Sequence, residues 1–421
     1  MKPVPLLPLL LALLLPSLSP AYGQAKDEPS LPDLQDAGAL GQDLFAQSGS
    51  TGMVLVVVRG GQSFFRGYGE TAPGSQALPS QDSVLRLCSL TKIFTTDVLF
   101  KLSADRTVHL DDPLQKFVPS RIEVPERVHP ITLADLAMHT SGLPRELGPM
   151  PKGTPHFTFP DHRTRWEWLP KQKLRSVPGT VSLYSNIGFD LLSDALASAT
   201  HRQYAALLAE RTLNPLHMPN TTYFPTSQQC ALLLTGVHDQ GPCTSTEETA
   251  GSSGLYSNAK DMTNWLKYLL RDKSETLPAQ DPGAQDVYMQ PSQLLRQVGL
   301  DHAGLPTGLG LGWIHIQPKE DLRHIVQKTG GGAGFLTYIA INHERDTAIF
   351  LAATDGGVPA HQNLFRAANN LLLTIAGLPP IPEPPARPVR KPKAATPRAK
   401  KAAGQGAKKA PAKPHKPRKR K

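Results

Sequence analysis

A serine and a lysine, Ser89 and Lys92, lie three residues apart at the start of a predicted apolar helix. This spacing places both side chains on one helical face. A serine hydroxyl needs a neighbouring base to become an effective nucleophile, and a lysine in apolar surroundings can lose its charge and serve as that base. The N-terminus of a helix also favours negative charge that develops beside the serine. Because Ser-x-x-Lys occurs by chance in most chains of this length, the pair needs further support.

Two further motifs follow the pair along the chain. Tyr-Ser-Asn occupies residues 184–186, after a turn and before a predicted helix, and Lys-Thr-Gly occupies residues 328–330, at the end of a predicted strand. The order Ser-x-x-Lys, then Tyr-x-Asn or Ser-x-Asn, then Lys-Thr-Gly is that of serine β-lactamases and penicillin-binding proteins. Three short motifs in one order are far more specific than any one of them.

A second Ser-x-x-Lys, at Ser257 and Lys260, tests this assignment. The same stretch contains a second Tyr-Ser-Asn. If Ser257 were the nucleophile, a Tyr-x-Asn or Ser-x-Asn would have to lie between Lys260 and Lys328, and none does. Only Ser89 gives a complete ordered set. We therefore interpret Ser257 or Asn258 as the cap of the helix that follows.

Hydrophobic periodicity predicts strands near both ends of the chain and helices between them. Strands are expected at residues 52–60, 63–68, 311–316, 325–329, 335–341 and 347–353. Helices are expected at residues 34–47, 92–102, 133–139, 189–199, 204–213, 262–270 and 360–375. The order predicts an α/β (α+β) fold, in which terminal helices flank one antiparallel sheet that is interrupted by an all-helical domain. We expect the site in a cleft where the two parts meet.

Composition divides the 421 residues into three parts. Residues 1–23 have one early lysine, a short apolar run and small residues near the end, which is typical of a secretory signal peptide. Residues 30–378 are expected to form the catalytic domain, with sheet parts at about 30–82 and 300–378 and the helical insertion at about 83–299. Residues 379–421 form a tail rich in proline, lysine and alanine, which we expect to be disordered.

The positive charge of the chain belongs to this tail. Residues 386–421 carry fifteen Lys or Arg and no Asp or Glu, so removing them from the net charge of +10 leaves −5. The tail is either a solvated appendage or an arm that binds a polyanion. No aromatic residues interleave with the basic ones and the signal peptide favours export, so we expect no nucleic-acid partner. The partners of such an arm would be anionic membranes or wall polymers.

Cysteine and histidine usage adds three expectations. In an oxidising compartment Cys230 and Cys243 could close a short loop by a disulfide. Cys88 would then remain as a buried thiol with no chemical role. The fourteen histidines show no zinc-ligand spacing, and we expect neither a metal nor another cofactor.

Longer stretches resemble a known family. Residues 87–96, 131–144, 184–186 and 328–331 resemble the class C β-lactamase and penicillin-binding protein superfamily. Residues 51–71 and 327–334 look like the D-alanyl-D-alanine carboxypeptidase/endopeptidases of the AmpH type. The resemblance covers residues 34–378 and leaves the basic tail outside. It implies a serine β-lactamase-like fold and a covalent acyl-enzyme mechanism.

The resemblance also implies roles for the motif residues. Ser89 would attack the carbonyl of a D-Ala-terminated peptide, and Lys92 and Tyr184 would share the proton transfers. A tyrosine with its ordinary pKa of about 10 is a poor base at neutral pH, but two nearby lysines would favour its phenolate. The implied binding residues are Asn186 for a substrate amide, Lys328 and Thr329 for the substrate carboxylate, the strand beyond Gly330 for the substrate backbone, and the N–H groups of Ser89 and Gly331 for the oxyanion.

We therefore expect a periplasmic serine D-Ala-D-Ala carboxypeptidase/endopeptidase that acts on peptidoglycan peptides. Penicillins should acylate it, because a β-lactam presents a strained amide beside a carboxylate, as D-Ala-D-Ala does. The alternatives are a class C-like β-lactamase or a serine esterase on the same fold, which differ in how fast water removes the acyl group. A third alternative is a slow penicillin sensor that traps the acyl group and is attached to an anionic surface by its tail.

Overall fold

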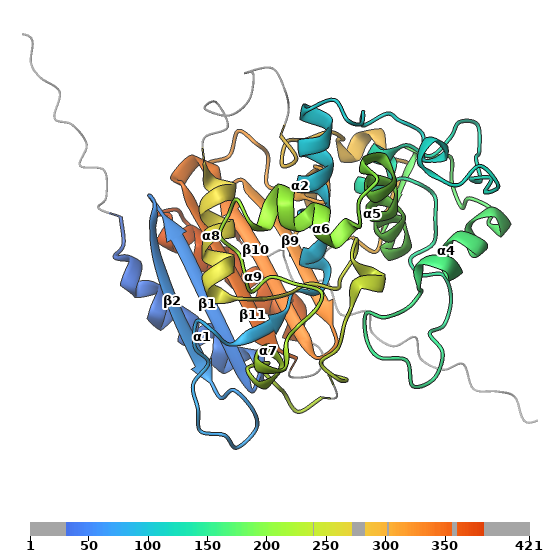
Figure 1. Ribbon diagram of the computed structural model, residues 1–421. Coiled ribbons are helices and arrows are strands. Elements are labelled where there is room, and N and C mark those ends of the chain that lie inside the picture. Colours follow the sequence, from blue (N-terminus) through green and yellow to red (C-terminus); the bar gives the residue numbers. More distant parts are fainter. Residues whose placement is uncertain (1–30, 239, 272–282, 301–302, 356–359, 383–421) are drawn as a thin grey trace, which may run out of the picture. The chain divides into compact units, whose positions relative to one another are not determined.

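A computed structural model of the protein (Figure 1) describes residues 31–238, 240–271, 283–300, 303–355 and 360–382. The predicted signal peptide at 1–23 lies outside the described residues, and so does all but the first four residues of the predicted tail. Within the described ranges, no helix combines the length and the apolar character that crossing a membrane requires.

The core of the fold is a seven-stranded antiparallel sheet in the order β2-β1-β11-β10-β9-β8-β7. The strands are β1 Gly52–Arg59, β2 Gln62–Gly69, β7 Pro306–Leu309, β8 Ile314–Ile316, β9 Ile325–Gly332, β10 Phe335–Asn342 and β11 Thr347–Thr354. The first strand pairs with the last, with Met53 opposite Ala353. The predicted antiparallel sheet is thus confirmed, and both ends of the domain contribute to it.

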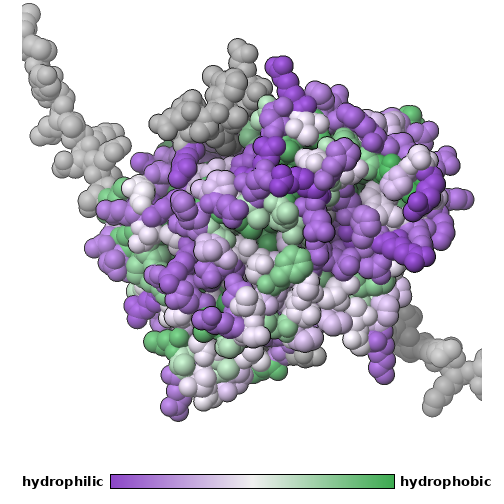
Figure 2. Space-filling view, in the orientation of Figure 1, coloured by the Kyte–Doolittle hydropathy of each residue, from purple (hydrophilic) through white to green (hydrophobic). Residues whose placement is uncertain are grey.

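Both faces of the sheet are apolar, because alternate side chains of a strand point to opposite faces. Leu55 of β1 packs with Leu372 beneath the terminal helices α1 (Ala37–Ser48) and α9 (Ala360–Ile375). Its neighbour Val56 belongs to the cluster on the other face, which includes α8 (Ala259–Leu270) and α2 (Thr91–Ala104). There Phe94 stacks on Trp265 with ring centroids 4.1 Å apart. The outer surface is mainly polar on the face that Figure 2 shows.

The predicted all-helical insertion is wrong in one respect, because the described part of residues 83–299 also contains short strands. β3 (Val84–Arg86) pairs with β5 (Tyr256–Asn258), and β4 (Val181–Leu183) pairs with β6 (Arg296–Val298). Strands of three residues are too short to show a period of two in the sequence. The α-helices of the insertion besides α2 and α8 are α3 Leu133–Ala137, α4 His162–Trp168, α5 Asn186–Thr200, α6 Tyr204–Leu208 and α7 Ser227–Ala231.

Short helical turns also occur among the described residues. They are η1 Leu34–Asp36, η2 Cys88–Leu90, η3 Leu114–Phe117, η4 Leu169–Lys171, the π-helical η5 Ala209–Leu213, η6 Glu247–Thr249, η8 Pro291–Gln293 and η9 His343–Arg345. The helix predicted at 204–213 is therefore α6 followed by a π-helical turn. The strand predicted at 311–316 is shorter, because Gly310 and Trp313 close a turn by a 2.9 Å backbone hydrogen bond, with Gly312 at φ +74°.

Candidate active site

Ser89 lies in the turn η2, which leads into α2 and contacts β9 and β10 of the sheet. The residue before it, Cys88, has a backbone φ of +51°, which residues other than glycine rarely adopt. Two contacts with the sheet hold the turn: the Cys88 thiol donates to the Gly332 carbonyl (3.3 Å), and the Thr337 hydroxyl donates to the Leu87 carbonyl (2.9 Å). The backbone around the candidate nucleophile is therefore fixed from the sheet side.

Lys92, the second residue of α2, is fully buried. Its Nζ donates to Asn186 Oδ1 at 2.7 Å, to the Ser252 carbonyl at 2.8 Å and to Ser89 Oγ at 3.4 Å. Burial lowers the pKa of Lys92 from its ordinary value, against the opposing effect of Tyr184. The arrangement gives Ser89 an amine neighbour that loses its proton more readily than an exposed lysine does.

Tyr184 follows β4 and approaches Ser89 from the insertion. Its hydroxyl donates to Ser89 Oγ at 2.8 Å. Lys92 Nζ, Lys328 Nζ and Arg145 Cζ lie 4.9, 5.3 and 4.7 Å from the centre of its ring. Three cationic groups near one phenol favour negative charge on its oxygen, which suits a group that takes and returns a proton.

His139 also belongs to this site, although from the sequence it was predicted only as the last residue of a helix at 133–139. Its ring stacks on that of Tyr184 with centroids 4.3 Å apart, and its Nδ1 accepts a 3.0 Å hydrogen bond from the backbone N–H of Ser185. Burial, together with the charge of Lys92, holds the pKa of His139 well below its usual range. A neutral ring thus supports Tyr184. No spacing signal pointed to it, because His139 and Ser185 are 46 residues apart.

β9 forms the third wall of the site. β8 pairs with β9 only from Ile325 to Gln327, so beyond Gln327 this edge of β9 faces η2. Gly330 is needed there, because a Cβ at this position would lie 2.9 Å from the Leu87 carbonyl oxygen and 3.1 Å from Ser89 N. Lys328 is buried, whereas Gly331 and Gly332 are exposed. An exposed strand edge of this kind can pair with an extended peptide.

Asn186, the first residue of α5, connects the buried lysine to the surface. Its Oδ1 accepts from Lys92 and its Nδ2 donates to Glu146 Oε1 at 2.5 Å. Glu146 and its neighbour Arg145 are exposed, and the sequence analysis named neither. Loop residues of this kind carry no local pattern that points to a site, and only the fold brings them to Asn186.

The structure thus brings Ser89, Lys92, Tyr184, Asn186 and Lys328 to one place, where η2 and α2, the β4–α5 connection and β9 meet. Thr329, Gly330 and Gly331 line the same strand edge. The second motif lies elsewhere: Ser257 is buried in β5 and hydrogen-bonded to Thr221 (2.8 Å), and Asn258 caps α8 by accepting a backbone N–H (3.0 Å). Lys260 forms an exposed ion pair with Asp82.

All three cysteines lie in the described part of the chain. Cys230 and Cys243 form a disulfide. Cys88 is a buried free thiol, and burial raises its pKa to about 12. A thiol that stays protonated at neutral pH is a poor nucleophile, in spite of its place beside Ser89. In the described part of the chain, no group of three or more His, Cys, Asp or Glu side chains could hold a metal ion.

Comparison with known proteins identifies the class. The β-lactamase family model matches residues 38–372, so the chain belongs to the β-lactamase family of serine hydrolases. Among individual proteins, the D-alanyl-D-alanine-carboxypeptidase/endopeptidase AmpH of Escherichia coli strain K12 is 40% identical over 342 residues, which cover 80% of this chain and 88% of that protein.

Solved structures agree with this family. The β-lactamase/D-alanine carboxypeptidase from Yersinia pestis, complexed with citrate, is 38% identical with a TM-score of 0.76, and the match covers 82% of this chain and 99% of that one. The class C β-lactamase from Rhodobacter sphaeroides is 22% identical with a TM-score of 0.61, over 80% of this chain and 98% of that one. The second likeness shows the fold alone.

Proposed function

We propose that this protein is a serine D-Ala-D-Ala carboxypeptidase/endopeptidase that acts on peptidoglycan peptides through an acyl-enzyme on Ser89. The observation that carries the proposal is the convergence on Ser89 Oγ of the Tyr184 hydroxyl at 2.8 Å and the buried Lys92 amine at 3.4 Å. The strand edge of β9 beside them suits a peptide substrate. The 40% identity with a carboxypeptidase/endopeptidase supports the substrate class.

In the acylation step, Ser89 Oγ attacks the carbonyl carbon of the penultimate D-Ala and gives up its proton to the Lys92–Tyr184 pair. The N–H groups of Ser89 and Gly331 stabilise the negative charge on the carbonyl oxygen. The C–N bond then breaks, and the leaving amine takes a proton from Tyr184. An ester between Ser89 and the shortened peptide remains.

Two residues of β9 explain why a terminal D-Ala is the leaving group. Lys328 Nζ and the Thr329 hydroxyl would bind the terminal carboxylate, while Asn186 would hold the amide on the acyl side. A β-lactam offers the same carboxylate beside a strained amide, and penicillins should therefore form the same ester. Water must then hydrolyse the ester, and the rate of this second step separates a carboxypeptidase from a β-lactamase or from a sensor.

One experiment tests the proposal against these alternatives. Purified protein is incubated separately with muropeptides, a cephalosporin and a short-chain ester, and both product and acyl adduct are followed by mass. We expect turnover of muropeptides with little hydrolysis of the cephalosporin. Rapid cephalosporin hydrolysis would make the protein a β-lactamase, and a long-lived adduct without turnover would make it a penicillin sensor.

We also propose that residues 1–23 direct export to the periplasm and that the basic tail binds anionic membrane or wall polymers. The tail composition supports this, because fifteen positive charges without an acidic residue attract polyanions. Truncation after Pro385 should leave turnover of soluble peptides unchanged and weaken binding to anionic vesicles or wall sacculi at low salt. Equal binding with and without the tail would contradict the proposal.

A further inference from the structure

Three polar residues form a stripe along α5 that leads from the candidate active site into the insertion. Asn186, Asp190 and Asp194 are spaced by four residues and therefore share one helical face. Asn186 contacts Lys92 at one end of the stripe, and Asp194 binds Arg165 at the other end. Asp190 lies between the two buried cations and is only 1% exposed.

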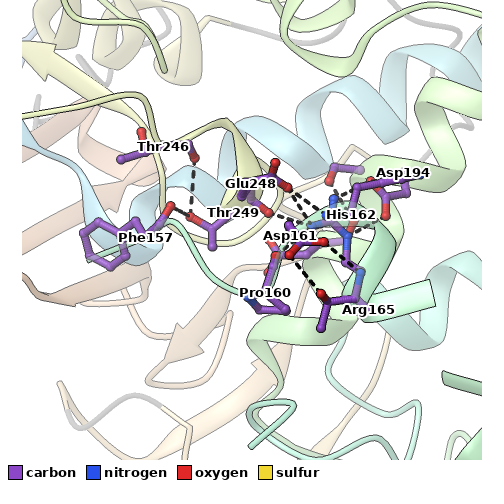
Figure 3. Close-up of polar contacts among 12 residues, drawn as sticks. Phe157, Pro160, Asp161, His162, Arg165, Asp194, Thr246, Glu248 and Thr249 are labelled. Carbon is purple, nitrogen blue, oxygen red and sulfur yellow. Dashed lines mark hydrogen bonds and ion pairs between the residues drawn. The ribbon is translucent and has the colours of Figure 1, made fainter. Parts of the chain in front are cut away.

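The hydrogen bonds of the Arg165 guanidinium are made to groups other than Asp190. Its Nε and Nη2 donate to the two carboxylate oxygens of Asp194 at 2.6 and 2.7 Å, and its Nη1 donates to the carbonyls of Glu248 (2.7 Å) and Pro160 (3.1 Å) (Figure 3). Asp190 is absent from this set, and its Oδ1 has no hydrogen-bond partner among the described residues. A buried carboxylate that is not needed for the geometry of Arg165 calls for another explanation.

The segment 251–253 connects Asp190 to the catalytic lysine. The Ser252 carbonyl accepts from Lys92 Nζ at 2.8 Å, and the Ser252 hydroxyl is a hydrogen-bond partner of the Asp190 carboxyl. Gly251 lies directly against α5, because a Cβ there would meet the Phe189 carbonyl oxygen at 2.0 Å. A single residue, wedged between α2 and α5, therefore separates the ammonium from the carboxylate.

We propose that Asp190 is a positioning residue whose negative charge favours the ammonium form of Lys92 and so sets the pH at which Ser89 becomes reactive. This inference rests on the proposed function, in which Lys92 must lose a proton before Ser89 attacks. The Asp190 carboxylate opposes burial, which favours the neutral amine. Burial and the charge of Lys328 lower the pKa of Lys92, whereas Tyr184 and, to a smaller extent, Asp190 raise it, and together they determine how much free base is present at a given pH.

Other charged groups face the same pair. The charged or titratable groups around Asp190 are Lys92 of α2, Arg165 of α4, Asp194 of α5 and the phenols of Tyr204 and Tyr223. Those around Lys92 are Tyr184, Lys328, His139 and Cys88. Burial raises the pKa of Asp190 to about 7, against the attraction of Arg165 and Lys92. Below that pH Asp190 is protonated, and its influence on Lys92 is weaker.

The test is the pH dependence of acylation by a penicillin, followed by mass in the full-length protein. The rate should fall along one limb of the pH profile as the pH is lowered and Lys92 becomes protonated. Above about pH 7, where Asp190 is charged in the wild type, this limb should lie about one unit lower in Asp190→Asn, since a neighbouring charge shifts a pKa by about that much. In that range the variant should react about tenfold faster than the wild type, and the two rates should converge at lower pH as Asp190 becomes protonated.

Asp97→Asn is the matched control, because Asp97 is also a buried carboxylate and lies on α2 itself, where it pairs with Lys101 (2.7 Å) and not with Lys92. This control should keep the wild-type limb. An unchanged limb in a folded Asp190→Asn protein would overturn the inference, and so would an equal shift in both variants. A wild type that no penicillin acylates would instead overturn the proposed function.

Ser252→Ala provides a second variant should Asp190→Asn fail to fold. Removing the hydroxyl removes a hydrogen bond that lowers the pKa of Asp190. Asp190 is then neutral over a wider pH range, so the limb should move in the same direction by a smaller amount. The Ser252 carbonyl still accepts from Lys92 in this variant, and a limb that does not move would again overturn the inference.

Discussion

The chain contains the tripeptide Tyr-Ser-Asn twice, and the two copies do different work. At residues 184–186, Ser185 caps α5 by accepting from a backbone N–H (2.9 Å), and Asn186 is the first helical residue. At residues 256–258, Asn258 caps α8 instead. The helix thus begins one residue later in the second copy. As a result, the first copy points its asparagine at Lys92, whereas the second uses its asparagine for the helix itself.

The two tyrosines differ in the same way. Both hydroxyls make a 2.8 Å hydrogen bond, Tyr184 to Ser89 and Tyr256 to the buried Arg86. The Ser-x-x-Lys copies differ in solvation, because Lys92 is fully buried, whereas the side chain of Lys260 is 51% exposed. The same local sequence therefore lies in the candidate active site in one copy and has a structural role in the other. The difference depends on the partners that the fold supplies and on the solvent exposure of the lysine.

The largest expected effect separates the two serines. Ser89→Ala should abolish the penicillin adduct, because it removes the oxygen that both Lys92 and Tyr184 contact. Ser257→Ala should leave the adduct intact and lower stability by about 1 kcal/mol, through the lost hydrogen bond with Thr221. Mass spectrometry after incubation with penicillin measures the first effect, and thermal unfolding the second. An adduct that survives Ser89→Ala would refute the assignment.

Substitutions of the two lysines should differ less in their effect on the acylation rate, but still by orders of magnitude. Lys92→Gln should slow acylation by about a thousandfold, since general-base catalysis contributes about 10²–10⁴. Glutamine retains a donor for the Asn186 and Ser252 oxygens. The drop in acylation rate therefore measures the loss of the general base and not a loss of folding. Lys260→Gln removes an exposed ion pair and should change neither acylation nor thermal unfolding much. Comparable rates for the two variants would show that burial of Lys92 is irrelevant.

Substitution of one tyrosine should affect the acylation rate, and substitution of the other should affect stability. Tyr184→Phe should slow acylation by about a hundredfold, because Ser89 loses a proton-transfer partner. Tyr256→Phe should leave the rate unchanged and cost about 1–3 kcal/mol of unfolding free energy, because it leaves one donor of the buried Arg86 without its acceptor. Acylation rates and denaturant unfolding of the two variants check both halves. A slow but fully stable Tyr256→Phe protein would break the comparison.

The order of three motifs predicted from the sequence alone a set of residues that the fold does bring together, and the apolar strands predicted the sheet. Sequence patterns missed what long-range packing creates. His139 stacks on Tyr184, and Asp190 reaches Lys92 through Ser252, without any spacing that a linear pattern could reveal. The short strands were missed for a similar reason, since β3 pairs with β5 across most of the insertion, with Val84 opposite Asn258.

The smallest effect should separate the two asparagines. Asn258→Ala removes the cap of α8 and should lower the free energy of unfolding by about 1 kcal/mol without slowing acylation. Asn186→Ala leaves Ser185 to cap α5, so stability should change little. Its effect should instead be a roughly tenfold loss in kcat/KM for muropeptides, about 1.4 kcal/mol of lost transition-state stabilisation, since Asn186 contacts Lys92 and would, in the proposed function, hold the substrate amide. Steady-state kinetics and thermal unfolding of the two variants measure these effects. If both variants lost stability alone, or activity alone, the two copies of the tripeptide would be equivalent.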